Sequence, residues 1–327
     1  MPFSFHRKSV RPPLVTLSAV LFAAATSACA SDEPAARSPN GITTVQVGVV
    51  PIVDVAPLYL GQEKGFYSKR GLKLDMVTAQ GGAAVIPGVV SGQLEFGFSN
   101  VTSLMLAQSN GMAVEGVSSG SASTGEQGAD YSAITVKGNS PIKTARNLEG
   151  KKVAVNTLKN IGDTSIRESV RKASGDPDKV RFVELPFDQM PAALDDGQID
   201  AAWVSEPALA VVRAQGGRII ASNYVDVAED LTVALYFTSA SHAKENSEVV
   251  DKFREATAES HAYANTHPDE VRQVLTTYTE IPRATIERMT LPKWPNGVNR
   301  ASVETLAELG QRDGLFSTAP DLDQLLP

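Results

Sequence analysis

Apolar and β-branched runs alternate with helix-like segments from residue 45 onward. Val45–Val50 predicts a buried strand, and Pro51 ends it because proline has no N–H for the ladder. A helix is predicted from near Ala56, where Asp54 can cap the N-terminus. Leu72–Val77 alternates as a second strand. The chain therefore opens as strand, loop, helix and strand, a unit whose ligands bind beyond the carboxyl ends of the strands.

The same pattern continues toward the C-terminus. Further strands are predicted at Leu94–Phe98, Val114–Ser118, Ser132–Val136, Val153–Val155, Val180–Glu184, Ile199–Val204, Arg218–Ala221 and Leu231–Thr238. Helices are predicted at Ala83–Val90, from the Ser99-Asn100 cap to Gln108, and at Thr164–Ala173, Asp188–Asp195, Ala208–Ala214, Glu248–Asn265, Pro268–Tyr278, Arg283–Met289 and Ser302–Asp313. Gly116–Gly128 is small and polar and is interpreted as a surface loop.

Two stretches of the chain resemble each other. Val89–Phe98 and Ala193–Ala202 each contain a helix end, a Gly-Gln pair, an apolar residue, an acidic residue and a buried strand. A strand–loop–helix unit that recurs in this way indicates two α/β lobes of similar construction.

The composition is that of an ordinary globular protein, with a formal net charge of -7 over 327 residues. This length suggests two domains or one large one. Loss of Met1–Ala28 would remove Arg7, Lys8 and Arg11 and no acid, so the remainder is more acidic still. Nucleic-acid binding requires a basic face and is therefore not expected. The single cysteine excludes an internal disulfide and a cysteine-rich metal site.

A secretion signal is predicted at residues 1–28. A positive segment precedes the apolar run Leu14–Ala25, which is too short to anchor in a bilayer and is typical of a signal-peptide core. The run ends in Thr26-Ser27-Ala28-Cys29, which resembles a bacterial lipobox, although Thr26 stands where leucine is commonest. Cys29 is therefore predicted to carry lipid, and residues 29–42 are predicted to form a polar tether.

Plain secretion is the alternative, with cleavage after the Ala28-Cys29-Ala30 triplet. We expect lipidation because the only cysteine of the chain falls at this position. The predicted location is the cell membrane, with the protein facing the outside or the periplasm.

Several short motifs together carry a family resemblance. They are Asp54-Val55-Ala56-Pro57-Leu58-Tyr59, Glu63-Lys64-Gly65-Phe66-Tyr67, Gly71-Leu72, Ser91-Gly92-Gln93-Leu94-Glu95-Phe96-Gly97, Asn147-Leu148-Glu149-Gly150-Lys151, Gly197-Gln198-Ile199-Asp200-Ala201 and Glu206-Pro207. The chain resembles the periplasmic substrate-binding proteins of ABC importers, in the branch for sulfonate, taurine, nitrate and thiamine-precursor uptake. The motifs are specific for the superfamily and weak for the ligand.

The resemblance implies an α/β fold of the two-lobe periplasmic-binding-protein type, similar to type II. Each lobe would hold a mixed or parallel sheet flanked by helices, with two crossings between lobes. Lobe 1 would comprise residues 43–131 and 238–327, and lobe 2 residues 132–237. A monomer without a cofactor would capture a small organic solute and deliver it to a membrane permease with its ATPase.

The resemblance also implies ligand contacts from loops that follow strands. Carried over by position, these are Asp54, Gly82, Ser99, Asn100, Asn156, Thr157, Asn160, Asp188, Trp203 and Glu206. Ser99, Asn100 and Asp188 can equally be helix caps, and Trp203 can equally be a core residue.

Two features of the sequence make opposite predictions about the charge of the ligand. Free N–H groups at the helix starts after Asn100 and Asn160 favour an acidic or polar solute, to which Lys159 could add a cation. Asp54 and Glu206 oppose an anion. A neutral or zwitterionic solute with an amine or ring N–H near these carboxylates would reconcile both features.

No catalytic arrangement is found in the sequence. The histidines show no metal-ligand spacing, and His261 and His267 are interpreted as surface residues of C-terminal helices. Neither a Gly-x-Ser-x-Gly elbow nor a phosphate-binding loop is present. The alternative function is an enzyme of the thiamine-pyrimidine synthase type, whose cysteine-rich motif is missing here. A cytoplasmic sensor domain is disfavoured by the signal peptide.

Overall fold

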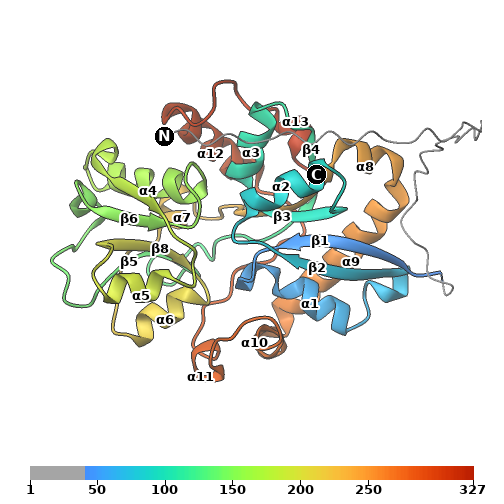
Figure 1. The fold of residues 1–327 in the computed structure, drawn as a ribbon, viewed down its shortest axis with the longest axis horizontal. Coiled ribbons are helices and arrows are strands. Elements are labelled where there is room, and N and C mark those ends of the chain that lie inside the picture. The colour runs from blue at the N-terminus through green and yellow to red at the C-terminus, as the bar shows by residue number, and fades with distance from the viewer. Residues whose placement is uncertain (1–40) are drawn as a thin grey trace, which may run out of the picture. The chain divides into compact units, whose positions relative to one another are not determined.

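A computed structural model describes residues 41–327, which contain two five-stranded sheets (Figure 1). The predicted signal peptide, Cys29 and all but the last two residues of the predicted tether lie outside the described residues. The first sheet, in the order β2-β1-β3-β10-β4, consists of β1 (Thr43–Val49), β2 (Leu72–Thr78), β3 (Phe96–Asn100), β4 (Val114–Ser119) and β10 (Ala234–Ser239). The second sheet, in the order β7-β6-β8-β5-β9, consists of β5 (Ser132–Val136), β6 (Lys152–Val155), β7 (Arg181–Glu184), β8 (Ala201–Ser205) and β9 (Arg218–Ala221).

The two sheets have the same construction. In the first, β2, β1 and β3 are parallel, and β10 is antiparallel to both β3 and β4. In the second, β7, β6 and β8 are parallel, and β5 is antiparallel to both β8 and β9. The chain passes from β4 of the first sheet to β5 of the second, and returns from β9 of the second sheet to β10 of the first. The two crossings implied by the resemblance are therefore confirmed.

The internal repeat is also confirmed. Its two copies form the α2–β3 and α5–β8 connections, and β3 and β8 occupy the same third position in their sheets. Gly92 and Gly197 both have a positive φ, of 76° and 72°, a backbone conformation that glycine adopts without strain.

Helices cover the sheets on both faces. The helices associated with the first sheet are α1 (Ala56–Glu63), α2 (Gly82–Val90), α3 (Val101–Ser109), α8 (Ala240–Glu245), α9 (Ser247–Thr266), α10 (Pro268–Leu275), α12 (Arg300–Arg312) and α13 (Leu322–Leu325). Those associated with the second are α4 (Ile161–Lys172), α5 (Met190–Asp195), α6 (Ala208–Ala214) and α7 (Asn223–Val227), and α11 (Arg283–Ile286) packs on α6. Figure 1 shows α4 and α7 on one side of the second sheet and α5 and α6 on the other.

The boundary predicted between residues 237 and 238 falls within β10 (Ala234–Ser239). This strand pairs with β3 and β4 of the first sheet from Ala234 onward, so the second crossing ends before the predicted boundary. The division into lobes otherwise stays a prediction.

The interpretation of Gly116–Gly128 as a surface loop is wrong for its first half. β4 extends to Ser119, and Ser121 and Ser123 are fully buried. A Cβ at Gly120 would lie 2.9 Å from Ala234 O, so small residues let the crossing pass close against β10. A run of small polar residues can therefore also mark a buried segment that packs closely against a neighbouring strand, as this one does against β10.

The interpretation of His261 as a surface residue is also wrong. The side chain is fully buried on α9, with its ring centroid 6.0 Å from that of Tyr236. Burial lowers the pKa of His261 to about 4, so the imidazole is neutral at physiological pH. A long helix against a sheet buries one stripe of its surface, and an uncharged histidine can be part of that stripe.

Candidate functional site

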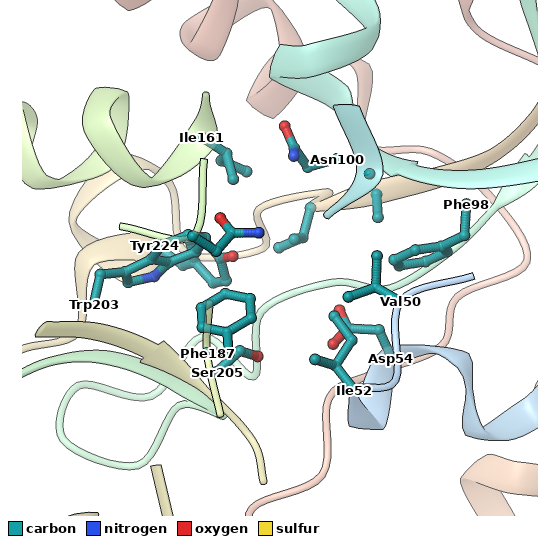
Figure 2. Close-up of a pocket in the computed structure, with 14 residues that line it drawn as sticks. Val50, Ile52, Asp54, Phe98, Asn100, Ile161, Phe187, Trp203, Ser205 and Tyr224 are labelled. Carbon is teal, nitrogen blue, oxygen red and sulfur yellow. The ribbon is translucent and has the colours of Figure 1, made fainter. Parts of the chain in front are cut away.

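A small cavity lies where strands of both sheets end. About half of its lining residues follow or end β1, β3, β6 and β8, as expected for a ligand site at the carboxyl ends of parallel strands. The cavity is lined by Val50, Ile52, Asp54, Gly82, Phe98, Asn100, Asn156, Ile161, Phe187, Trp203, Ser205, Tyr224, Val233 and Ala234 (Figure 2). Its volume of about 30 Å³ is room for little more than a water molecule.

Asp54 lines this cavity but does not cap α1, so that part of the prediction is wrong. The residue before α1 is Val55, and Asp54 lies in the 3₁₀ turn Val53–Val55. The Asp54 carboxylate points instead toward the segment between β4 and β5. Its Oδ1 accepts hydrogen bonds from Ser121 Oγ at 2.5 Å and Tyr131 Oη at 3.0 Å. Its Oδ2 is buried and has no partner among the described residues. Burial raises the pKa of Asp54 to about 6, so the group is mostly ionised at neutral pH.

Asn100 and Gly82 lie together on the side of the first sheet. Asn100 caps α3 as predicted, because its Oδ1 accepts from Ser103 N at 2.9 Å. Gly82 begins α2 directly over β3, where a Cβ would lie 2.7 Å from Ser99 Cα, so only glycine permits this approach. Ser99 is buried behind Gly82 and does not line the cavity.

Asn156 and Asn160 lie together on the side of the second sheet, between β6 and α4. Asn160 caps α4 by accepting from Gly162 N at 2.9 Å, so the helix begins three residues before the predicted Thr164. Asn160 also donates to Asn156 Oδ1 at 3.0 Å, and only Asn156 of this pair lines the cavity. Thr157 is half-buried beside them and does not line it either.

Aromatic rings form much of the wall. Trp203 is both a cavity residue and a core residue, since it is buried and donates its Nε1–H to Ser132 Oγ at 2.7 Å. Its ring meets those of Phe187 and Tyr224 edge-on, with centroids 5.2 and 6.1 Å away. In Figure 2, Trp203 and Tyr224 lie at one side of the cavity and Asp54 at the other.

Sequence reasoning missed Phe98, Phe187 and Tyr224. Phe98 could have been found from its alternate position with Asn100 on the same strand. Phe187 is adjacent to the predicted Asp188, whereas nothing in the pattern indicated the short helix that holds Tyr224.

Two predicted contacts lie elsewhere. Asp188 is exposed and lines an outer cleft of about 470 Å³, which shares Val50, Ile52 and Phe187 with the inner cavity. Glu206 is fully buried, and its carboxylate accepts from Ala210 N at 2.8 Å and, more weakly, from Thr290 N at 3.3 Å. Burial raises the pKa of Glu206 to about 7. Glu206 therefore joins backbone segments rather than lining the cavity.

The anion site predicted before α4 already has internal carboxylate partners. Leu158 N donates to Glu184 Oε2 at 2.9 Å, and Lys159 N donates to Asp163 Oδ2 at 2.8 Å. The Lys159 side chain is exposed and does not line the cavity. No lysine, arginine or histidine is among the described residues that line it.

Comparison with known proteins identifies the family. A model of the family described as NMT1/THI5 like matches residues 52–271. The chain belongs to this family. It is 24% identical over 214 residues to a putative aliphatic sulfonates-binding protein of Bacillus subtilis (strain 168), which covers 64% of this chain and 61% of that protein. It is 27% identical over 225 residues to a putative ABC transporter periplasmic binding protein of Brachyspira hyodysenteriae, covering 66% and 63%. The chain spans less than two thirds of the length of these curated relatives.

Similar solved structures confirm the predicted fold. The periplasmic aliphatic sulphonate binding protein SsuA from Escherichia coli has a TM-score of 0.69 at 18% identity, covering 86% of this chain and 97% of that one. The periplasmic nitrate-binding protein NrtA from Synechocystis PCC 6803 has a TM-score of 0.74 at 16% identity, covering 86% and 84%. At these identities the likeness establishes the two-lobe α/β architecture and not the ligand.

Residues 41–327 contain neither a candidate metal cluster nor a candidate membrane span. No group of three or more His, Cys, Asp or Glu side chains in this range could hold a metal ion. Within the same range, no helix combines the length and apolarity needed to cross a bilayer.

Proposed function

We propose that this protein is the solute-binding component of an ABC importer. One observation carries the proposal: a cavity at the carboxyl ends of parallel strands is lined by residues of both sheets. Family membership supports it, as do relatives named for binding sulfonates or for periplasmic ABC transport. The protein captures a small solute outside the membrane and presents it to a permease and its ATPase. It acts as a monomer and makes or breaks no bond in the solute.

Closure of the two lobes is the step that the permease reads. A solute between the sheets contacts both at once and so favours the closed arrangement by its differential affinity for it. The two crossing segments are the connections about which the lobes move.

A thermal-shift screen tests the proposal. A solute that binds the folded state at 100 times its Kd stabilises it by about 2.7 kcal/mol and raises the Tm. Sulfonates, carboxylates, nitrate, amines and pyrimidines should be compared at equal concentration. If none of these classes shifts the Tm at millimolar concentration, the protein is not a binder of small solutes.

Asn100→Ala and Asn156→Ala are expected to weaken solute binding by about 1–3 kcal/mol each, the cost of a lost buried hydrogen bond. Asn299→Ala is the matched control, because Asn299 caps α12 through Ser302 N in the way that Asn100 caps α3. Asn100→Ala and Asn299→Ala should therefore lose similar stability, and only the former should lose affinity. Calorimetric titration measures the affinities, and equal affinity in all three variants would contradict the placement of the solute.

Cys29→Ala is expected to release the protein from the membrane, because we propose a lipid on Cys29 as its anchor. Fractionation of expressing cells should move the variant to the soluble extracytoplasmic fraction while the wild type remains with membranes. Mass spectrometry of the mature wild-type protein provides the direct check. An unmodified N-terminus at Ser31 would refute the anchor.

A further inference from the structure

We infer that the bound solute is neutral or cationic, with an N–H donor for Asp54 and an apolar, ring-sized body, and is not an anion of the sulfonate or nitrate kind. This inference rests on the proposed function and concerns the same cavity. It separates this chain from the similar proteins whose names specify sulfonates or nitrate.

The charged side chains around the site are acidic. The inner cavity contains Asp54, and the outer cleft contains Asp188 and Glu280. Among the described residues that line either space, none is a lysine, arginine or histidine. An anion that enters this site loses its hydration and meets carboxylates with no cation beside them. The free-energy cost of its desolvation is therefore not offset by an opposite charge.

Two residues of the cavity wall carry buried polar atoms without hydrogen-bond partners among residues 41–327. Asp54 and Ser205 line the cavity, and Asp54 Oδ2 and Ser205 Oγ are buried without a hydrogen-bond partner in the described part of the chain. Buried polar atoms are nearly always paired, so these two need partners from water or a ligand. A carboxylate oxygen can only accept, and the matching group on the solute is an N–H donor. The pKa of Asp54, about 6, leaves this carboxylate charged at neutral pH.

Backbone N–H groups at the N-termini of α3 and α4 are donors on which a bound anion would rely. At α3, Val101 N donates to Val233 O and Ser103 N to Asn100 Oδ1. The loop before α4 donates to the carboxylates of Glu184 and Asp163, as described above. These donors are already satisfied within the chain, which weakens the attraction of the N-termini of α3 and α4 for an anion.

The body of the solute follows from the aromatic wall and the two volumes. Phe187, Trp203 and Tyr224 present ring surfaces, which suit a flat apolar group and attract a cation. The inner cavity of about 30 Å³ is too small for a ring, whereas the adjoining cleft of about 470 Å³ falls in the usual range for ligand sites. Phe187 lines both spaces and is half-buried, so its displacement joins them. The donor group then lies at Asp54 and the body extends past Phe187.

A series of benzene derivatives with one body and different head groups tests the inference. The probes are benzamidine, benzamide, benzoate and benzenesulfonate, together with nitrate and bicarbonate, each titrated into the purified protein. Benzamidine and benzamide are expected to bind at least about tenfold more tightly than the two anions of the same shape, because hydrogen bonds to a charged partner contribute about 1.5–3 kcal/mol.

Two variants identify the carboxylate responsible. Asp54→Asn keeps an acceptor for Ser121 and Tyr131 but replaces Oδ2 by an NH₂ group, and should weaken benzamidine by about tenfold or more while improving benzoate. Asp188→Asn alters an exposed residue of the outer cleft and should weaken benzamidine about twofold without changing benzamide. The second variant remains informative if the first lowers the Tm too far for titration.

The outcomes separate the two claims. Tighter binding of benzoate, benzenesulfonate, nitrate or bicarbonate than of benzamidine and benzamide overturns the inference and leaves solute binding intact. Unchanged benzamidine affinity in Asp54→Asn also overturns it, since Asp54 would not contact the head group. Binding of no probe, together with a failed broader thermal-shift screen, overturns the proposed function itself.

Discussion

Trp294→Ala is expected to lower the free energy of unfolding by about 3–5 kcal/mol, the usual cost of deleting a buried aromatic side chain. Trp294 is 2% exposed and lies in the segment between α11 and α12. Its indole Nε1 donates to Asp54 O at 2.9 Å, and its backbone exchanges two hydrogen bonds with the side chain of Asn265. The substitution therefore leaves a cavity and also loosens the turn that carries the carboxylate of the site.

Trp294→Phe separates these two effects. Phenylalanine retains most of the ring volume and loses the donor to Asp54 O, so a smaller loss of about 1–2 kcal/mol is expected. Urea unfolding of both variants measures the stabilities, and titration with a bound solute measures the affinity. A loss below about 1 kcal/mol in Trp294→Ala would mean that this segment does not support the site.

Glu206→Ala is expected to destabilise the fold by roughly 3 kcal/mol, because its carboxylate accepts two backbone N–H groups that the variant leaves buried and unpaired. Glu184→Ala is the control. Glu184 also accepts one backbone N–H, from Leu158, but its side chain is exposed and water can replace it, so a loss within about 1 kcal/mol is expected.

The cost of Glu206→Ala should also depend on pH. Burial raises the pKa of Glu206 from 4.5 in the unfolded chain to about 7 in the folded protein, against the opposing effect of the N–H groups of Ala210 and Thr290. The folded state therefore binds a proton that the unfolded state has released. The resulting stability is fully present below pH 4.5 and is lost as the pH rises through about 7.

Between about pH 6 and pH 8, the wild type should lose roughly 1 kcal/mol of stability through this group, and Glu206→Ala should not. The difference between the two proteins cancels the histidines, whose depressed pKa values act in the opposite sense. Unfolding curves at both pH values provide the measurement. A difference that stays constant or grows with pH would show that Glu206 is ionised throughout.

Asp54 illustrates how much of the site could be predicted. Its position after the first strand and before a helix was enough to predict it near the cavity that it lines, and Asn100 and Asn156 line the same cavity. Their contact with a solute stays a prediction. Its role was mistaken, because a sequence shows the helix that an aspartate precedes and not the serine and tyrosine that approach from 67 and 77 residues away. Glu206 and Asp188 were predicted on the same grounds and do not line this cavity, although Asp188 lines the adjoining cleft.

The sequence by itself determined the order of the strands and of most of the helices, the repeat of the α/β unit and the family. Those features depend on local periodicity, turn residues and short motifs, which neighbouring residues specify. Only the tertiary structure decided that Ser121 and His261 are buried, that Phe187 and Tyr224 join the cavity wall, and that Asp54 faces it without a counter-ion. Burial and partnership depend on elements brought together by the two crossings, because contacts between residues distant along the chain leave no periodic pattern in it.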